Sequence, residues 1–434
     1  MSPIACNSFK DKNLSRYFIT SIIIKAFVTA LLLSSFIYLT YFNITNYLLH
    51  SVLACAGLWL LFKSDRIGYF FTGFFIGILW FYWISLSFRY YGDLAWLIPI
   101  VIIGIGIIYG LLFLIPSLLT NSAYLHAIAL VLFSQIAPFG FNWFNFELIL
   151  YYTPFGLTSL QVIFLIISIL LVQNSHKGYR FLAFICFIAA FDFSNKEPPK
   201  MPDIDLKIVQ TRISQDKKWE TEAIIKHVQE NFKNIESAIE EKKQLIILPE
   251  TAFALYLNKN EVIVAKLLEY SQNISIITGA LGYEEGKYYN SAYFFNKGIM
   301  QRADKVVLVP FAEKVPLPNL ISYYINSIFF NGASDFSEAE HPSDFIVDGI
   351  KIRSAVCFEG SRSEIYEDSP KIISVISNNA WFLPSIQPTM QNLMLSLYAT
   401  KNGAIILHSV NGDGSKIIVP RKSILRMVSE QFSR

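Results

Sequence analysis

The chain has 434 residues, of which 53% are hydrophobic and only 16% charged, whereas soluble globular chains carry about 25% charged residues. The net charge of +3 and the absence of a basic stripe interleaved with aromatic residues argue against a nucleic-acid partner. The six histidines show no metal-ligand spacing, so neither a metal site nor another cofactor is expected.

The few charges are unevenly distributed along the chain. Residues 18–62 and 94–137 are almost free of charge, whereas residues 196–243 are rich in Lys and Glu. We therefore predict an N-terminal membrane domain, residues 1–193, followed by a soluble domain, residues 194–434.

Seven apolar segments of the first domain are candidates for membrane-spanning helices, which need about 20 apolar residues. They are Ile19–Phe42, Tyr47–Phe62, Gly68–Phe88, Leu94–Leu119, Asn121–Phe141, Phe155–Gln173 and Gly178–Phe193. The second and the last are short for a span. The first is too long for a signal peptide, and no small-residue cleavage site precedes the next apolar run.

The basic residues between these segments predict the orientation of the domain. Seven lie in loops on one side, namely Lys10, Lys12, Arg16, Lys63, Arg66, Lys177 and Arg180, and the opposite short loops contain only Arg89. Because basic loops stay in the cytoplasm, the N-terminus is expected there. An odd number of spans then places the soluble domain outside the cytoplasm.

Two features of the membrane domain have alternative interpretations. Gly104–Gly110 resembles a phosphate-binding loop but lies in an apolar helix, where Gly106 and Gly110 favour close helix packing. The aromatic loop Pro138–Gly156 is typical of an interfacial belt and less often of a binding site. Glu147 is its only charge, and an acid at this depth is a functional candidate.

The soluble domain follows a polar, proline-containing linker at Asp192–Asp203. Apolar residues at spacings of three and four predict helices, whereas short apolar runs predict strands. The expected helices are Trp219–Lys242, Glu261–Tyr270 and Thr389–Lys401. The expected strands are Leu206–Gln210, Leu245–Leu248, Ile274–Thr278, Ser291–Phe295, Lys351–Cys357, Lys371–Ser377, Gly403–Ser409 and Lys416–Val419. This order predicts a layered α/β domain.

Three reactive residues border apolar runs of this domain. Glu250 follows Leu245–Pro249, Lys305 precedes Val306–Pro310, and Cys357 ends its predicted strand. Each alone is more simply a solvated strand end or a packed thiol. Together they supply a base, a cation and a nucleophile for acyl transfer, at strand ends where α/β folds place their sites.

Several motifs resemble bacterial apolipoprotein N-acyltransferase, a membrane-anchored member of the nitrilase superfamily. They are Val209–Trp219, Leu248–Ala252, Lys305–Pro316, Val356–Glu359 and Ile376–Phe382. The resemblance covers nearly the whole chain. It implies a polytopic helical membrane bundle joined to a nitrilase-like αββα sandwich on the periplasmic side of the bacterial inner membrane.

The resemblance also implies an activity. A fatty acyl chain would move from a phospholipid, through a thioester on Cys357, to the free amine of the diacylglyceryl-cysteine that begins an apolipoprotein. Glu250 matches the general base of the family and Lys305 its catalytic lysine, whereas Lys314 falls where no basic residue is required. The remaining matches are supporting residues, namely Glu313, Glu359 and Trp381.

The sequence departs from the family pattern at several positions. Ala312 replaces a usual glycine, Asn379 a usual aspartate and Leu383 another glycine, and the usual arginines are missing around Lys401, Asn402 and His408. After Arg421–Val428 no closing span is evident, so the C-terminus is expected to stay outside the cytoplasm.

The cysteines favour the catalytic interpretation. Cys6 is expected in the cytoplasm, Cys55 and Cys186 lie in apolar segments, and Cys357 therefore has no disulfide partner in the outer domain. Two alternatives remain: a membrane-tethered amidase that uses water as the acceptor, and a non-catalytic membrane scaffold.

Overall fold

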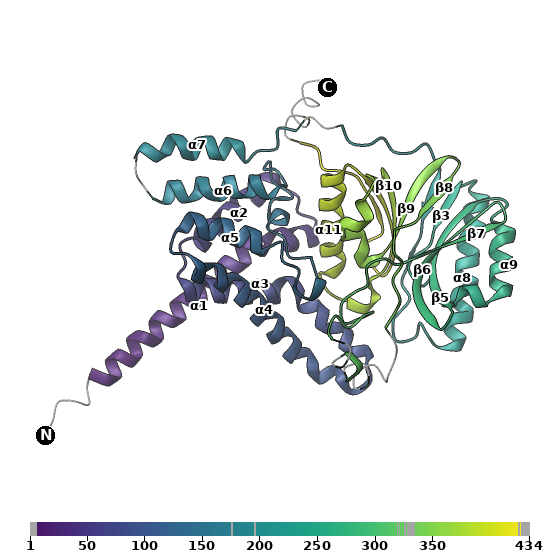
Figure 1. Cartoon of the computed structure of the whole chain (residues 1–434), viewed down its shortest axis with the longest axis horizontal. Helices are drawn as coiled ribbons and strands as arrows, with labels where there is room; N and C mark the ends of the chain where they lie inside the picture. The colour runs from purple at the N-terminus through teal and green to yellow at the C-terminus, as the bar shows by residue number, and fades with distance from the viewer. Residues whose placement is uncertain are drawn as a thin grey trace.

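A computed structural model of the chain divides into a helical part and an α/β part that pack against each other (Figure 1). The structure describes residues 7–174, 177–194, 197–318, 320, 322–324, 327, 335–423 and 426. Cys6 and most of the tail after Arg421 lie outside the described residues, and so do two residues of the predicted linker. The predictions made for these residues therefore stay predictions.

The helical part contains seven apolar α-helices in the described residues. They are α1 (Asn7–Tyr41), α2 (Tyr47–Leu61), α3 (Arg66–Phe81), α4 (Ile98–Leu119), α5 (Ala123–Phe133), α6 (Ser159–Gln173) and α7 (Arg180–Ala189). Four stretches are long and apolar enough to cross a membrane: Ile19–Tyr41, Arg66–Tyr90, Gly92–Leu119 and Ala123–Gly140. The helices α2, α6 and α7 are shorter, so a count of seven spans stays a prediction.

Gly106 and Gly110 of α4 serve helix packing, as the sequence indicated. A Cβ atom on Gly106 would lie 2.7 Å from the Phe74 ring, and one on Gly110 would lie 2.8 Å from the Phe70 ring. Both rings belong to α3, so α3 and α4 approach each other more closely than side chains larger than hydrogen allow.

The α/β part contains two six-stranded sheets. The first has the order β1-β3-β5-β6-β7, with β4 paired to β5, and the second has the order β12-β11-β10-β9-β8, with β2 paired to β11. The strands of the first sheet are β1 (Leu206–Ile208), β3 (Leu245–Ile247), β4 (Phe253–Tyr256), β5 (Ser275–Glu284), β6 (Lys287–Asn296) and β7 (Ile299–Asp304). Those of the second are β2 (Gln210–Thr211), β8 (Asp344–Val347), β9 (Ile350–Val356), β10 (Ile372–Asn378), β11 (Ile405–Asn411) and β12 (Lys416–Ile418).

Three layers of buried side chains hold these elements together as a four-layer αββα sandwich. Apolar residues of both sheets, such as Ile247 and Ile376, meet between the sheets. Helices α8 (Thr221–Glu240) and α9 (Glu261–Tyr270) cover the outer face of the first sheet. Helix α11 (Gln387–Asn402) covers the second sheet and also faces the membrane helices (Figure 1). The predicted fold class is confirmed.

The aromatic loop between α5 and α6 joins the two parts. Trp143, Phe144 and Phe146 are buried in one hydrophobic cluster that also includes Phe358 and Met390 of the α/β part. An interfacial belt would instead expose these rings to lipid headgroups. The expectation of a belt is therefore wrong, because the rings find apolar partners in Phe358 and in helix α11.

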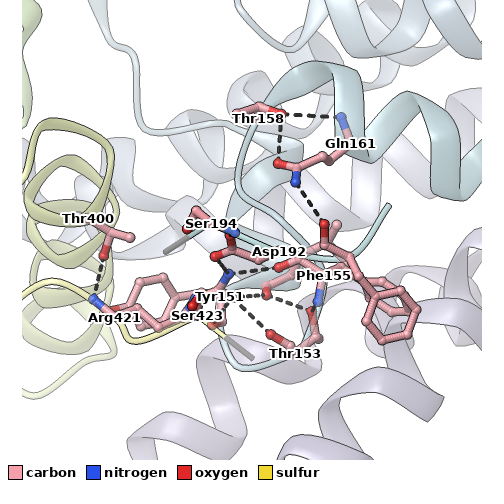
Figure 2. A network of polar contacts seen from close by, with 12 residues as sticks. Tyr151, Thr153, Phe155, Thr158, Gln161, Asp192, Ser194, Thr400, Arg421 and Ser423 are labelled. Atoms are coloured by element: carbon pink, nitrogen blue, oxygen red, sulfur yellow. Dashed lines mark hydrogen bonds and ion pairs between the residues drawn. The ribbon is translucent and has the colours of Figure 1, made fainter. Parts of the chain in front are cut away.

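Ionic contacts reinforce the same junction. Glu147 is buried and accepts a 2.5 Å hydrogen bond from the ammonium group of Lys401 on α11. Farther along, the guanidinium of Arg421 donates to the backbone carbonyls of Leu150, Tyr151, Thr153 and Phe155, and it pairs with Asp192 (Figure 2). Glu147, the acid that the sequence marked as a functional candidate, thus forms an ion pair with Lys401 between the two parts of the structure.

Candidate active site

Glu250 lies just beyond β3, where the sheet ends at the buried sequence Leu248-Pro249. Its carboxylate oxygen Oε1 accepts a 2.8 Å hydrogen bond from Nδ2 of Asn290 on β6. Burial raises the pKa of Glu250, and the Lys305 cation opposes that shift. A carboxylate in this setting has an increased affinity for protons, as a general base requires.

Lys305 lies directly after β7, and its side chain is completely buried. Nζ donates a 2.7 Å hydrogen bond to Oε2 of Glu313, whose Oε1 accepts from the same Asn290 amide at 2.7 Å. Burial alone would lower the pKa of Lys305, but the carboxylates of Glu313 and Glu250 raise it. Lys305 is therefore a fixed cation.

The apolar run Val306–Pro310 that follows Lys305 does not form a strand. The backbone N–H groups of Val306 and Val307 donate to Oε2 of Glu359, and that of Val309 donates to Oε2 of Glu313. These donors bind carboxylates and are not available to a sheet ladder. The run is consequently an irregular loop anchored to two acids of the candidate site.

Cys357 lies at the turn between β9 and the 3₁₀ helix η7 (Cys357–Ser361). Its φ angle is +56°, a strained value for a residue with a Cβ atom, and such strain is concentrated at functional positions. Burial raises the pKa of the thiol to about 12, the Glu250 carboxylate adds to this shift, and Lys305 opposes it. The thiol is thus protonated at neutral pH and needs a base to ionise.

The Glu359 carboxylate is buried and accepts hydrogen bonds from the backbone on either side of the site. Its two oxygens accept hydrogen bonds from the backbone of Val356 at 2.6 Å, Val306 at 2.8 Å and Val307 at 3.2 Å. It therefore ties the turn that carries Cys357 to the loop that follows Lys305. Burial raises the pKa of Glu359 to about 7, against the opposing charge of Lys305 and these three donors.

Comparison with known proteins agrees with both parts of the structure. The family described as apolipoprotein N-acyltransferase integral membrane domain matches residues 19–193, and the carbon-nitrogen hydrolase family matches residues 206–431. The apolipoprotein N-acyltransferase of Wolinella succinogenes is 43% identical over 396 residues, which are 90% of this chain and 94% of that protein. The enzyme of the same name from Campylobacter jejuni is 38% identical over 421 residues, 96% of this chain and 93% of that protein.

The chain belongs to the apolipoprotein N-acyltransferase family. It is an enzyme of the acyltransferase class, with a helical membrane domain and a nitrilase-like domain.

In this acyltransferase Trp381 packs against two tyrosines of the membrane domain. Its ring stacks on Tyr91 at 5.9 Å between centroids and meets Tyr90 edge-on at 5.5 Å. Both tyrosines belong to the membrane domain, at the end of the 3₁₀ helix η1 (Tyr82–Tyr90). The predicted substrate-facing tryptophan is thus half-buried at the junction of the two domains.

The turn that carries Cys357 packs directly on the membrane domain. The ring of Phe358 stacks on Phe141 at 5.6 Å between centroids. The indole N–H of Trp143 donates a 2.7 Å hydrogen bond to Oγ of Ser361, at the other end of the turn. The aromatic loop therefore supports the backbone that carries Cys357.

Sequence reasoning missed two members of the site, Asn290 and Lys218. Asn290 bridges the two carboxylates, and its position inside a strand gave no sequence signal. Lys218 is completely buried and donates a 3.2 Å hydrogen bond to the backbone carbonyl of Glu250. Burial lowers its pKa to about 8, with the Glu250 charge opposing. Its place beside Trp219 in a family-like motif was the available signal.

The site uses side-chain acids, a cation and a thiol. In the described residues no group of three or more His, Cys, Asp and Glu side chains has the arrangement of a metal site. The chemistry available to these residues is nucleophilic acyl transfer with acid–base assistance.

Proposed function

We propose that the enzyme transfers a fatty acyl chain from a phospholipid to the N-terminal amine of a diacylglyceryl-cysteine apolipoprotein, through a thioester on Cys357. The observation that carries the proposal is the position of the Glu250–Lys305–Glu313–Cys357 cluster. Its nucleophile turn packs on the aromatic loop of the membrane domain, next to the bilayer in which both lipid-anchored substrates reside.

The first half-reaction begins with deprotonation of the thiol. Glu250 takes the Sγ proton, and the thiolate attacks the ester carbonyl carbon of the phospholipid. Lys305 stabilises the negative charge that develops on the carbonyl oxygen. The carbon–oxygen bond to glycerol then breaks, Glu250 returns its proton to the departing oxygen, and a lysophospholipid leaves behind an acyl-Cys357 thioester.

The second half-reaction uses the amine of the apolipoprotein. The amine attacks the thioester carbonyl, Glu250 accepts the amine proton, and the carbon–sulfur bond breaks. The amide product leaves, and the thiolate regains its proton from Glu250. Glu313 supports both steps, because it holds the Lys305 ammonium by a 2.7 Å hydrogen bond.

The two-domain organisation is part of the proposal. Residues 1–193 form the membrane domain, and residues 194–434 form the catalytic domain. The enzyme resides in the bacterial inner membrane with the catalytic domain on the periplasmic face, where its phospholipid donor and apolipoprotein acceptor are found. The basic residues of the loops support this orientation.

Withholding the acceptor tests the thioester. Labelled phospholipid alone should leave a labelled acyl chain on the enzyme, and neutral hydroxylamine should release it, because thioesters react with hydroxylamine faster than oxygen esters do. The label should map to Cys357 and be absent from Cys357→Ala. Glu250→Ala should label poorly, because the thiol then lacks its base.

Two results would contradict the proposal. Labelling of Cys357→Ala at the parent level would remove Cys357 from the chemistry. Release of free fatty acid without transfer to an added diacylated peptide would instead make water the acceptor, as it is in the amidase alternative.

A further inference from the structure

A chain of buried hydrogen bonds from Asn392 through His408, Ser377 and Gln391 reaches Cys357. Nε2 of Gln391, on α11, donates to Sγ of Cys357 at 3.7 Å and to Oγ of Ser377 at 3.1 Å. Oγ of Ser377 lies 2.9 Å from Nε2 of His408, and Nδ1 of His408 lies 3.0 Å from Oδ1 of Asn392. Gln391, Ser377 and His408 have no exposed surface.

The direction of every bond in this chain follows from its far end. Nδ2 of Asn392 donates a 3.0 Å hydrogen bond to the backbone carbonyl of Gly414, which can only accept. Oδ1 of Asn392 therefore faces His408 and can only accept as well, so Nδ1 of His408 carries a proton.

The second nitrogen of His408, Nε2, then determines the directions of the hydrogen bonds at Ser377 and Gln391. Burial lowers the pKa of His408 to about 3, and Lys416 contributes to the shift, so the ring is neutral and its Nε2 is an acceptor. The Ser377 hydroxyl consequently donates to His408 and is left to accept from Gln391. The Gln391 amide must turn its NH₂ group toward Ser377, and the same group faces Cys357.

This orientation of the Gln391 amide leaves its oxygen unpaired among the described residues. Oε1 of Gln391 is buried and has no hydrogen-bond partner in the described part of the chain, and such an acceptor destabilises the fold. A flipped amide would place an acceptor against the Ser377 hydroxyl, which already donates to His408. The hydrogen bonds from Asn392 through His408 to Ser377, called the relay below, therefore determine that the NH₂ group of Gln391, and not its oxygen, faces the Cys357 sulfur.

We propose that Gln391 is a catalytic hydrogen-bond donor to the Cys357 sulfur, and that Ser377, His408 and Asn392 are positioning residues that fix the direction of its amide. The inference rests on the proposed function, because it takes Cys357 as the nucleophile. A donor at this point stabilises the thiolate that forms when Glu250 removes the proton, and again when the amine displaces the thioester sulfur.

The Gln391 donor acts among charged groups that also face the thiol. Glu250 and Glu313 disfavour the thiolate, whereas Lys305 favours it. With two carboxylates and one ammonium, the local charges are unfavourable to a further anion. A neutral donor compensates for this without adding a charge that would disturb the Glu250 base.

Alkylation of Cys357 by iodoacetamide measures this contribution without any lipid. The purified full-length enzyme is treated across a pH series, and modification of Cys357 is followed by peptide mass spectrometry, which separates it from the other cysteines. Gln391→Met should slow alkylation about tenfold at a given pH, which moves the rising limb of the profile about one pH unit higher. Ser377→Ala should shift the profile in the same direction by a smaller amount, because the amide is then free to flip.

A matched control lies one turn earlier on the same helix. Gln387 is equally buried, but its Nε2 donates to Asn379 rather than to the thiol. Gln387→Met should leave the alkylation profile unchanged. An unchanged profile for Gln391→Met would overturn the donor, and an unchanged profile for Ser377→Ala would overturn the relay.

The alkylation test of Gln391 and the acyl-labelling test of the proposed function can fail independently. If Cys357→Ala keeps the acyl label, the proposed function fails whatever the alkylation profiles show. If Cys357 takes the acyl label but Gln391→Met alkylates like the parent, the function stands and the inference about Gln391 fails.

Discussion

Two lysines near the site differ sharply in their surroundings. Lys305 is completely buried and held by Glu313, whereas Lys314 is exposed and pairs with Glu338 at the surface. We expect Lys305→Ala to lose acyl labelling by at least about 100-fold, as removal of an oxyanion-stabilising group does. Lys314→Ala should retain most of the activity, because exposed ion pairs contribute about 0–1 kcal/mol. Equally large losses in the single-turnover labelling assay would mean that the lysine is wrongly assigned.

The buried Lys218 offers a test of the pH dependence. Burial raises the pKa of Glu250. The proposed base must be ionised to accept a proton, so labelling should decline as the pH falls through a pKa above about 4.3, the ordinary value for Glu. Lys218 opposes the shift in Glu250. Lys218→Met should therefore move the acid limb of the labelling profile upward by about one pH unit.

The neighbouring Lys217, which is exposed, provides the matched control for this prediction. Lys217→Met should leave the acid limb in place. A profile of Lys218→Met that coincides with the parent would show that this cation does not act on the base.

At the level of elements, Glu359 joins two segments that are far apart in the sequence. Its carboxylate accepts from the backbone of Val356 in one segment and of Val306 and Val307 in the other. In Glu359→Gln an NH₂ group replaces one accepting oxygen and faces an N–H donor. We expect a loss of about 1–3 kcal/mol of stability, the cost of unsatisfied buried donors, and a large loss of acyl labelling.

Thermal unfolding in detergent and the labelling assay measure these two effects. Glu364, an acid on the same segment that is paired with Arg362, supplies the control, and Glu364→Gln should be close to neutral in both. If Glu359→Gln unfolds and labels like the parent, the hydrogen bonds to the Glu359 carboxylate contribute neither to stability nor to activity.

The elements also show which parts of the fold the sequence predicts and which it does not. Helix α9 was predicted with its observed bounds, Glu261–Tyr270, because its apolar spacing is local information. The strands β4, β7 and β8 were missed. β4 and β8 are only four residues long, and β7 carries mostly exposed or polar residues, so their strand geometry depends on pairing with neighbours. The irregular course of Val306–Val309 was not predicted, because Glu359, which binds the N–H groups of Val306 and Val307, is distant in sequence.

The same distinction applies to the candidate site. Glu250, Lys305 and Cys357 stood out because reactive side chains border apolar runs. Gln391 and Ser377 did not, because a buried glutamine and serine acquire their meaning only from the tertiary contacts that orient them. The resemblance to a family supplied roles for the first set and none for the second.

At the scale of the whole molecule, Arg421 fastens the end of the catalytic domain to the membrane domain. Its guanidinium is buried among four backbone carbonyls and Asp192 (Figure 2). Breaking a buried pair of this kind costs about 3–5 kcal/mol, so Arg421→Met should unfold at a markedly lower temperature in detergent. Arg212→Met, which breaks an exposed pair with Asp413, should unfold like the parent. If the two variants unfold alike, the contacts of Arg421 do not contribute to stability.

The orientation of the whole chain in the membrane is the remaining prediction. Seven basic residues in loops on one predicted side, against Arg89 on the other, favour a cytoplasmic N-terminus. With an odd number of spans, the catalytic domain and residue 434 lie in the periplasm. A phosphatase that is active only outside the cytoplasm should therefore work when fused after residue 434. The same reporter fused after Ser64, in the basic loop between α2 and α3, should be inactive. The reverse pattern is an active fusion after Ser64 and an inactive one after residue 434, both stably expressed. It would place Cys357 in the cytoplasm, on the opposite side of the membrane from the proposed acceptor.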